Sequence, residues 1–234
     1  MKKTVFIYAK PPVMGLSKTR LAEGLGAAEA QRIARWTFGQ TLRAVKDPRW
    51  NTVLATTPDT YLDATLGGLW PKSLERMSQG TGNLTDRLNK GLRQAPNGKV
   101  LFIGADCPDI SNALIVEAFE KLSTSEAVFG PAHDGGFWLF GINKRVNTPS
   151  PFENVRWSTK HALGDVRDNL FGLGKISYLP ELIDIDTADD WKAWQTGGEI
   201  SVTSPRISSA SKDSAAPAKK KKSRGLFGFF RKSA

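Results

Sequence analysis

Asp106 stands directly after a strongly apolar stretch, residues 100–103, which predicts a strand buried on both faces. Gly104 ends this stretch and Pro108 prevents an immediate helix, so Asp106 is expected at the carboxyl end of a central strand. Ligands bind at that edge of open parallel sheets, and a carboxylate held there needs a cation or hydrogen-bond donors. Asp106 is therefore interpreted as a metal or substrate carboxylate. The alternative is a cap for the next helix, but Ser111 is better placed for that role.

A basic loop follows the first predicted strand. Lys10, Lys18 and Arg20 fall within eleven residues, and Gly15 permits a tight turn between them. A loop of this kind at a strand end, with cations and free backbone N–H groups, is suited to phosphates. It fits neither the P-loop nor the dinucleotide-binding spacing of glycines. Phosphate binding and an ordinary solvated loop therefore both stay open at this point.

Two further carboxylates could join the same edge of the sheet. Asp134 lies in a turn with two adjacent glycines, where it could join Asp106 on a metal ion, although Asp-Gly is also a common hairpin signal. Asp184 and Asp186 are spaced so that either could act as a third carboxylate or contact the cations, or else they belong to a solvated acidic turn. His133 is a weak candidate for a base. Trp157 is predicted either to form a wall of an acceptor site or to be buried.

A glycine-rich turn precedes a helix that carries leucines at helical spacing. Gly80 and Gly82 would let the backbone approach a base or a phosphate at the start of this helix. The alternative is a plain turn with Asn83 or Thr85 as the helix cap. Taken alone, the pattern slightly favours the plain turn.

Strand and helix patterns alternate along the first 196 residues. This alternation predicts a three-layer α/β/α sandwich with a mostly parallel, doubly wound sheet. Strands are expected at residues 5–9, 52–56, 100–103, 126–130, 137–140 and 175–179, and helices at 27–45, 61–66, 84–92, 111–122, 159–171 and from 187. With 234 residues, 40% of them hydrophobic, the chain can form one domain, placed at 1–196, and a disordered tail, placed at 197–234.

The positive charge is concentrated in the tail. Residues from 199 onward hold nine Lys or Arg and two acidic residues, so seven of the ten net positive charges lie there. The body is therefore not expected to bind nucleic acid specifically. Residues 219–234 combine cations with aromatic side chains, which suits an anionic membrane surface; RNA contact and an inert end are the alternatives. A single cysteine and the lack of a long apolar run predict a cytoplasmic protein, peripheral at the inner face of the membrane if the tail docks.

Five motifs in the same order link the chain to a known family. They are Ala9-Lys10-Pro11 with residues 15–21, residues 79–84 with Arg87, Gly104-Ala105-Asp106-Cys107-Pro108, residues 130–137, and Asp184-Ile185-Asp186-Thr187. Over residues 1–195 the chain resembles the GT-A-like nucleotide-diphospho-sugar transferase superfamily. It is most similar to a bacterial group of glycosyltransferases, some associated with arsenosugar biosynthesis. It resembles molybdenum-cofactor and phospholactate guanylyltransferases more distantly.

The resemblance implies a nucleotide held over the end of the first strand, with Lys18 and Arg20 near its phosphates. Gly80, Gly82 and Asn83 would lie near the base. Asp106 would hold Mg²⁺ or Mn²⁺, with Asp134 as the second ligand, and these two carboxylates are the candidate catalytic residues. The usual Asp-x-Asp motif of such glycosyltransferases is absent, since the second Asp of this loop comes one residue too late.

Three functions follow as hypotheses. The first is a metal-dependent glycosyltransferase that uses a nucleotide-sugar donor and an unknown small-molecule acceptor. The second is a nucleotidyltransferase that takes a nucleotide from an NTP and releases pyrophosphate. The third is a non-catalytic nucleotide-binding scaffold.

Overall fold

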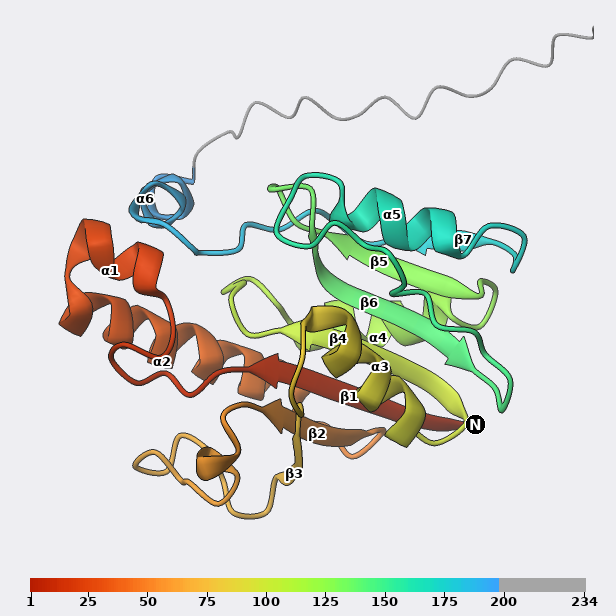
Figure 1. The fold of residues 1–234 in the computed structure, drawn as a ribbon, viewed down its shortest axis with the longest axis horizontal. Coiled ribbons are helices and arrows are strands. Elements are labelled where there is room, and N and C mark those ends of the chain that lie inside the picture. The colour runs from red at the N-terminus through yellow and green to blue at the C-terminus, as the bar shows by residue number, and fades with distance from the viewer. Residues whose placement is uncertain (198–234) are drawn as a thin grey trace, which may run out of the picture. The chain divides into compact units, whose positions relative to one another are not determined.

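The computed structural model describes residues 1–197, and a seven-stranded sheet forms their centre (Figure 1). In spatial order the strands are β3 (Glu75–Ser78), β2 (Asn51–Thr56), β1 (Lys2–Ala9), β4 (Gly98–Gly104), β6 (Phe137–Lys144), β5 (Ala127–Pro131) and β7 (Ile176–Tyr178). All neighbours pair in parallel except β6, which is antiparallel to both β4 and β5. The predicted fold class, an α/β protein with a mostly parallel sheet, is confirmed.

Helices cover both faces of the sheet because successive side chains of a strand point to opposite sides. In β1, Val5 and Ile7 pack in the cluster that includes α2 (Ala27–Val45) and α4 (Asn112–Lys121). Phe6 packs on the other side, with residues of α3 (Leu84–Gln94) and α5 (Ala162–Asn169). The strands of the centre are therefore apolar on both faces, as the unbroken run at 100–103 predicts.

Two more helices lie beyond the end of β1. Leu21 of α1 (Thr19–Leu25), Ile33 of α2 and Ile185 form a small third core, against which Trp191 of α6 (Ala188–Gln195) packs. In Figure 1 the arrowhead of β1 points towards α1. Because α1 and α6 are joined by this core, the chain near residue 186 is brought to the basic loop that precedes α1.

Side-chain caps fix where three helices begin. Ser111 accepts from the backbone N–H of Leu114 at the start of α4, as predicted. Thr187 and Asp190 form a capping box at α6, which the sequence also predicts. Asn83 caps α3 and forms a capping box with Asp86. Of the two caps that the sequence suggested, Asn83 and Thr85, the structure therefore has Asn83.

Three expected elements differ in the structure. The helix expected at residues 61–66 is instead a short 3₁₀ turn, η1 (Asp59–Tyr61). The edge strand β3 was not predicted, because Glu75–Ser78 lacks an apolar run. The helix expected from residue 159 to residue 171 is shorter, since α5 begins at Ala162 and ends at Asn169.

No helix among residues 1–197 is long and apolar enough to cross a membrane. The predicted disorder of the tail and its docking on an anionic membrane through residues 219–234 lie outside the described residues. The boundary at 196/197 stays a prediction.

Candidate active site

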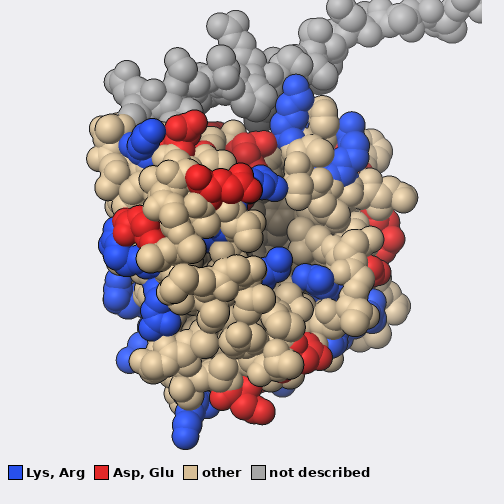
Figure 2. Space-filling model, turned by 60° about the vertical axis from the view of Figure 1, so that its left-hand side comes forward, with Lys and Arg blue, Asp and Glu red and all other residues tan. Residues whose placement is uncertain are grey.

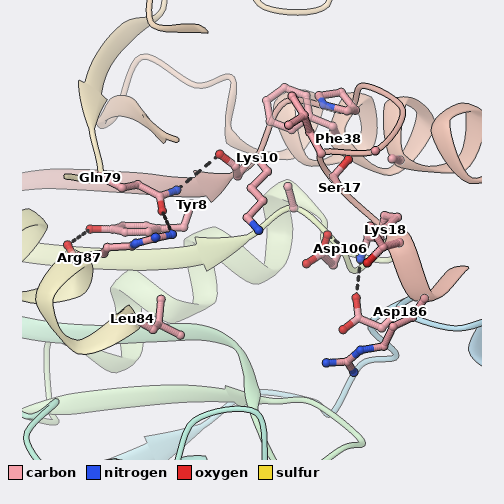
Figure 3. A pocket seen from close by; sticks show the side chains of 18 residues that line it. Tyr8, Lys10, Ser17, Lys18, Phe38, Gln79, Leu84, Arg87, Asp106 and Asp186 are labelled. Carbon is pink, nitrogen blue, oxygen red and sulfur yellow. Dashed lines mark hydrogen bonds and ion pairs between the residues drawn. The ribbon is translucent and has the colours of Figure 1, made fainter. Parts of the chain in front are cut away.

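A basic cavity of about 530 Å³ lies at the carboxyl ends of β1 and β4 (Figure 3). Its walls come from the loop after β1, from α2 and from the start of α3. The face drawn in Figure 2 is hollowed near its centre, with basic and acidic side chains around the rim. The charged residues that line the cavity are Lys10, Lys18, Arg20, Arg87, Asp106 and Asp186. The structure thus brings together Lys10, Gly15, Lys18 and Arg20 of the predicted phosphate loop with two of the predicted carboxylates.

Lys18 is the buried link between the basic loop and the two carboxylates. Its side chain is only 7% exposed, and its Nζ lies 2.8 Å from Oδ1 of Asp106 and 2.6 Å from Oδ1 of Asp186 (Figure 3). Burial by itself would lower the pKa of the ammonium, but the charges and hydrogen bonds of both carboxylates outweigh it and raise the pKa. The carboxyl group of Asp106 therefore faces the basic segment and does not cap a helix.

The backbone explains how these distant residues meet. The backbone N–H of Ile185 donates to the carbonyl oxygen of Asp106 at 3.1 Å, which holds the segment before α6 against the loop after β4. Lys18 itself has a left-handed backbone, with a φ of 55°, at the start of α1. Such a conformation is costly for a residue with a Cβ and is found where surrounding contacts enforce it. Here the enforcing contacts are the two ion pairs.

Tyr8 and Gln79, two polar residues that line the cavity, were not predicted as site residues. The Gln79 amide is buried; its Nε2 donates to the carbonyl of Ala55 at 2.9 Å and its Oε1 accepts from Arg87 at 3.5 Å. The hydroxyl of Tyr8 donates to the carbonyl of Arg87 at 2.9 Å. These contacts tie the ends of β1 and β2 to α3 (Figure 3). A single buried amide produces no periodic pattern in the sequence. Gln79 is therefore marked only by its position in the motif at residues 79–84.

The glycine-rich turn lies beside the basic cavity, between two residues that line it. Gly80, Gly82 and Asn83 do not line the basic cavity within residues 1–197, whereas their neighbours Gln79 and Leu84 do. The Asn83 side chain is engaged in capping α3. A role for these three residues near a base stays a prediction.

A second cavity of about 330 Å³ adjoins the first one and shares Tyr8, Leu84 and Asp106 with it. Asp134 and Trp157, both predicted as site residues, line this second cavity. Trp157 lies in the loop before α5, and its ring packs against Phe137 and Phe152 with centroids 6.1 and 6.3 Å away. Asp106 therefore stands at the junction of a basic cavity and a second cavity with aromatic walls.

Asp184 is a partly buried carboxylate that lines the second cavity. Burial raises its pKa from 3.8 to about 6, and the charges of Asp134 and Asp186 add to the increase. Its Oδ1 lies 3.0 Å from Nδ1 of His133, but the two atoms are not aligned for a hydrogen bond. Within residues 1–197, Asp184 Oδ1 is thus buried with no hydrogen-bond partner. His133 also has Asp190 3.3 Å from its Nε2, so both ring nitrogens face carboxylates rather than a cavity.

The donor set fits a hard divalent cation that is bound together with a ligand. Mg²⁺ usually takes one or two carboxylates plus substrate phosphates and waters, and Mn²⁺ also accepts oxygen ligands. Asp106 and Asp134 line one cavity, next to the basic one. Among residues 1–197, no group of three or more His, Cys, Asp or Glu side chains is placed to hold a metal ion.

The two glycines after Asp134 contribute differently to the turn: Gly136 donates a hydrogen bond to Asp134, and Gly135 allows a close approach to Lys160. The turn joins β5 to β6, and the backbone N–H of Gly136 donates to Oδ1 of Asp134 at 2.7 Å. Gly135 has a φ of 87°, and a Cβ there would lie 2.5 Å from the backbone of Lys160. The turn can therefore approach the loop at residues 157–160, which lines the second cavity, only because residue 135 lacks a side chain.

Gly135→Ala is expected to lower the free energy of unfolding by about 2–3 kcal/mol, from backbone strain and from the clash with Lys160. Urea unfolding measures this change. Gly164→Ala is the matched control, because a Cβ at this helical position meets no atom within 4 Å. The control should be neutral or stabilising by up to about 1 kcal/mol. Equal stability of the two variants would contradict the close approach at Gly135.

Asp184→Asn is expected to stabilise the protein at neutral pH. Because the pKa of Asp184 is about 6 in the folded protein and 3.8 ordinarily, the folded state holds its proton longer as pH rises. The wild type therefore loses stability between about pH 4 and pH 6 and keeps that deficit above pH 6. The variant should lack this loss and be about 2 kcal/mol more stable at pH 7. Thermal unfolding across pH 4–8 checks this, with exposed Asp189→Asn as control; parallel pH profiles for the wild type and Asp184→Asn would contradict it.

Several solved structures share this fold. A protein from Desulfovibrio desulfuricans provisionally named a nucleotide-diphospho-sugar transferase superimposes with a TM-score of 0.75 and 24% identity, over 86% of this chain and 90% of that one. A 4-diphosphocytidyl-2C-methyl-D-erythritol synthase from Anaerococcus prevotii has a TM-score of 0.53 and 12% identity, over 83% and 98%. A cytidylyltransferase from Leptospira borgpetersenii has a TM-score of 0.52 and 14% identity, over 84% and 86%. These likenesses establish a shared fold.

The family is established separately by sequence. Residues 41–159 match the family model described as "Uncharacterized protein conserved in bacteria (DUF2064)", and the chain belongs to this family. No curated protein matches the chain.

Proposed function

We propose that this protein is a metal-dependent glycosyltransferase that uses a nucleotide-diphospho-sugar donor. The observation that carries the proposal is the contact of Asp106 with Lys18 at the junction of the two cavities. A nucleotide diphosphate matches the excess of cations in the first cavity, and the second cavity leaves room for an acceptor beside it. As a finer part of the proposal, we assign the protein to the glycosyltransferase group that includes the arsenosugar-biosynthesis type.

The cationic and the acidic residues of the site would have different roles. Lys10, Arg20 and Arg87 would bind the diphosphate, while Lys18 keeps Asp106 and Asp186 in position. Asp106 and Asp134 would hold Mg²⁺ or Mn²⁺. That ion, when bound, would neutralise charge that develops on the leaving diphosphate.

Sugar transfer in this site requires one proton acceptor. An acceptor hydroxyl would lose its proton to a carboxylate of the second cavity, for which Asp134 and Asp184 are the candidates. Its oxygen would bond to the anomeric carbon as the bond from that carbon to the diphosphate oxygen breaks. The products would be the glycosylated acceptor, a nucleoside diphosphate and the proton held by the carboxylate.

Nucleotidyl transfer is the second candidate, because a cytidylyltransferase is among the proteins with this fold. The same basic cavity would then hold an NTP, and pyrophosphate would leave. The two reactions are separated by incubating the full chain with Mg²⁺ or Mn²⁺ and either a panel of nucleotide sugars or the four NTPs. We expect release of nucleoside diphosphate from a nucleotide sugar. Pyrophosphate release from an NTP alone would favour the second candidate, and metal-independent binding without turnover would favour a non-catalytic scaffold.

A further inference from the structure

A surface that combines cations with apolar side chains lies at the edge of the sheet opposite the two cavities. This edge is formed by the amino ends of the parallel strands and by the carboxyl end of the antiparallel strand β6. Three segments make up the surface, which we call the rim: residues 1–3 at the start of β1, 144–147 at the end of β6 and 171–175 before β7. In Figure 1 the N-terminus, the arrowhead of β6 and the loop before β7 lie on the right, away from α1 and α6.

Each segment of the rim exposes a large apolar side chain to solvent. Val146 and Phe171 are 80% and 94% exposed, and Met1 and Leu173 are exposed as well. The rim thus holds four of the seven large hydrophobic side chains that are exposed among residues 1–197. The last two segments are neighbours in space, because Arg145 and Leu173 line the same cavity of about 190 Å³. Single exposed apolar residues are ordinary, but a concentration of them indicates an interaction surface.

Each segment of the rim also holds cations. The rim has five Lys or Arg and no acidic residue, namely Lys2, Lys3, Lys144, Arg145 and Lys175. Two carboxylates near these segments are balanced, since Glu126 pairs with Arg145 at 2.7 Å and Asp168 pairs with Arg167 at 2.9 Å. The four lysines of the rim form no ion pair within residues 1–197. Their charge is therefore available to an external anion.

The charge of the rim contrasts with that of the remaining body. Seven of the ten net positive charges of the chain belong to the tail from residue 199, so residues 1–198 have a net charge of three. The rim alone carries five positive charges, and the rest of the body is therefore acidic on balance. Such an asymmetry orients a protein towards an anionic surface.

We propose that the rim docks the protein on the surface of an anionic phospholipid membrane. The apolar side chains would enter the boundary between headgroups and acyl chains, where their burial is favourable. Lys2, Lys144 and Lys175 would attract the lipid phosphates around them. The two cavities lie at the other edge of the sheet and would face the aqueous phase.

Two other partners match the rim less well. In a symmetric dimer the same patch meets its own copy, so the cations of the two rims would face one another. Nucleic acids are bound through cations and through flat side chains that stack on bases, whereas Met1, Val146 and Leu173 have no flat face. An anionic bilayer matches the charge and the apolar side chains of the rim together.

A fluorophore on the rim tests this contact in the full chain. Because the single cysteine, Cys107, is buried, Val146→Cys can be labelled with the thiol-reactive dye NBD, whose emission shifts to the blue when it leaves water. Met14→Cys is the matched control, since Met14 is also exposed but lies in the loop after β1, at the opposite edge. We expect a blue shift at residue 146 with vesicles that contain phosphatidylglycerol. Residue 14, and vesicles of phosphatidylcholine alone, should give none.

Substitutions on the rim separate its two components. Phe171→Ser with Leu173→Ser removes apolar side chains, and Lys2→Gln with Lys175→Gln removes two charges. Each pair should weaken cosedimentation with the anionic vesicles at least about fivefold. Because the label at residue 146 reports on the rim itself, its shift is distinct from any binding through residues 219–234.

Lys160→Gln with Lys192→Gln is the matched control for the charge pair. Both lysines are exposed, and they lie near the turn after β5 and on α6, at the edge that holds the cavities. This control should keep nearly full binding. The proposal is overturned if the chain does not bind the vesicles, if it binds them without a shift at residue 146, or if neutral vesicles give the same shift.

The same measurements expose the two rejected partners. A shift at residue 146 that grows with protein concentration without vesicles would show contact between copies, and a shift with RNA but not with vesicles would show nucleic-acid binding. Either result would overturn the proposal. None of these experiments involves a nucleotide substrate, so their outcome is independent of the proposed function.

Discussion

Asp106→Asn is expected to lower transferase turnover by about a thousandfold, because the change removes a negative charge at the junction of the two cavities. The carboxylate contacts Lys18 on one side and is the proposed metal ligand on the other. Its loss should also weaken binding of Mg²⁺ or Mn²⁺ in the presence of nucleotide. Release of nucleoside diphosphate from a nucleotide sugar measures the first effect, and calorimetric titration of the metal measures the second.

Asp109→Asn is the matched control for this change. Asp109 lies three residues further on in the same loop and loses the same charge, but its side chain accepts from Trp194 Nε1 at 2.9 Å and lines neither cavity. We expect the control to keep nearly full turnover. Near-normal turnover of Asp106→Asn would remove the metal assignment, and with it the mechanism proposed above.

Lys18→Met is expected to reduce both stability and nucleotide affinity. The change leaves Asp106 and Asp186 facing each other without the ammonium that lies between them. Since these carboxylates are 50% and 45% exposed, water compensates part of the loss, and we expect the free energy of unfolding to fall by about 1–2 kcal/mol. Nucleotide affinity should fall about tenfold or more, because Asp106 is no longer held in position and the negative charge of the two carboxylates next to the phosphate site is no longer balanced.

Lys10→Met separates the two effects of the Lys18 change. Lys10 lines the same cavity, but it forms no ion pair within residues 1–197. We expect this control to weaken nucleotide binding as well, with a change in stability within about 0.5 kcal/mol. Urea unfolding and nucleotide titration of both variants check this pair of expectations. If Lys18→Met unfolds at the same urea concentration as the control, the buried ion pairs do not stabilise the fold.

The pattern of the chain determined most of the local structure. Alternating strands and helices, the caps at Ser111 and Thr187, and the basic loop after β1 follow from spacing and residue type, because these features depend on residues a few positions apart. The position of Asp106 at a strand end follows in the same way, since the apolar run at residues 100–103 ends three residues before it. These signals were sufficient to predict the sheet edge at which the cavities lie.

Only the tertiary structure decided which distant residues meet at that edge. Lys18 and Asp186 are 168 residues apart, and no local pattern specifies their contact. The insertion of β6 between β4 and β5, the approach of Gly135 to Lys160 and the buried amide of Gln79 likewise depend on how elements pack. A local pattern tells which face of an element is apolar, whereas the partner of that face is selected by packing of the whole domain. For the same reason, the division into a basic cavity and a second one with aromatic walls became visible only in the folded protein.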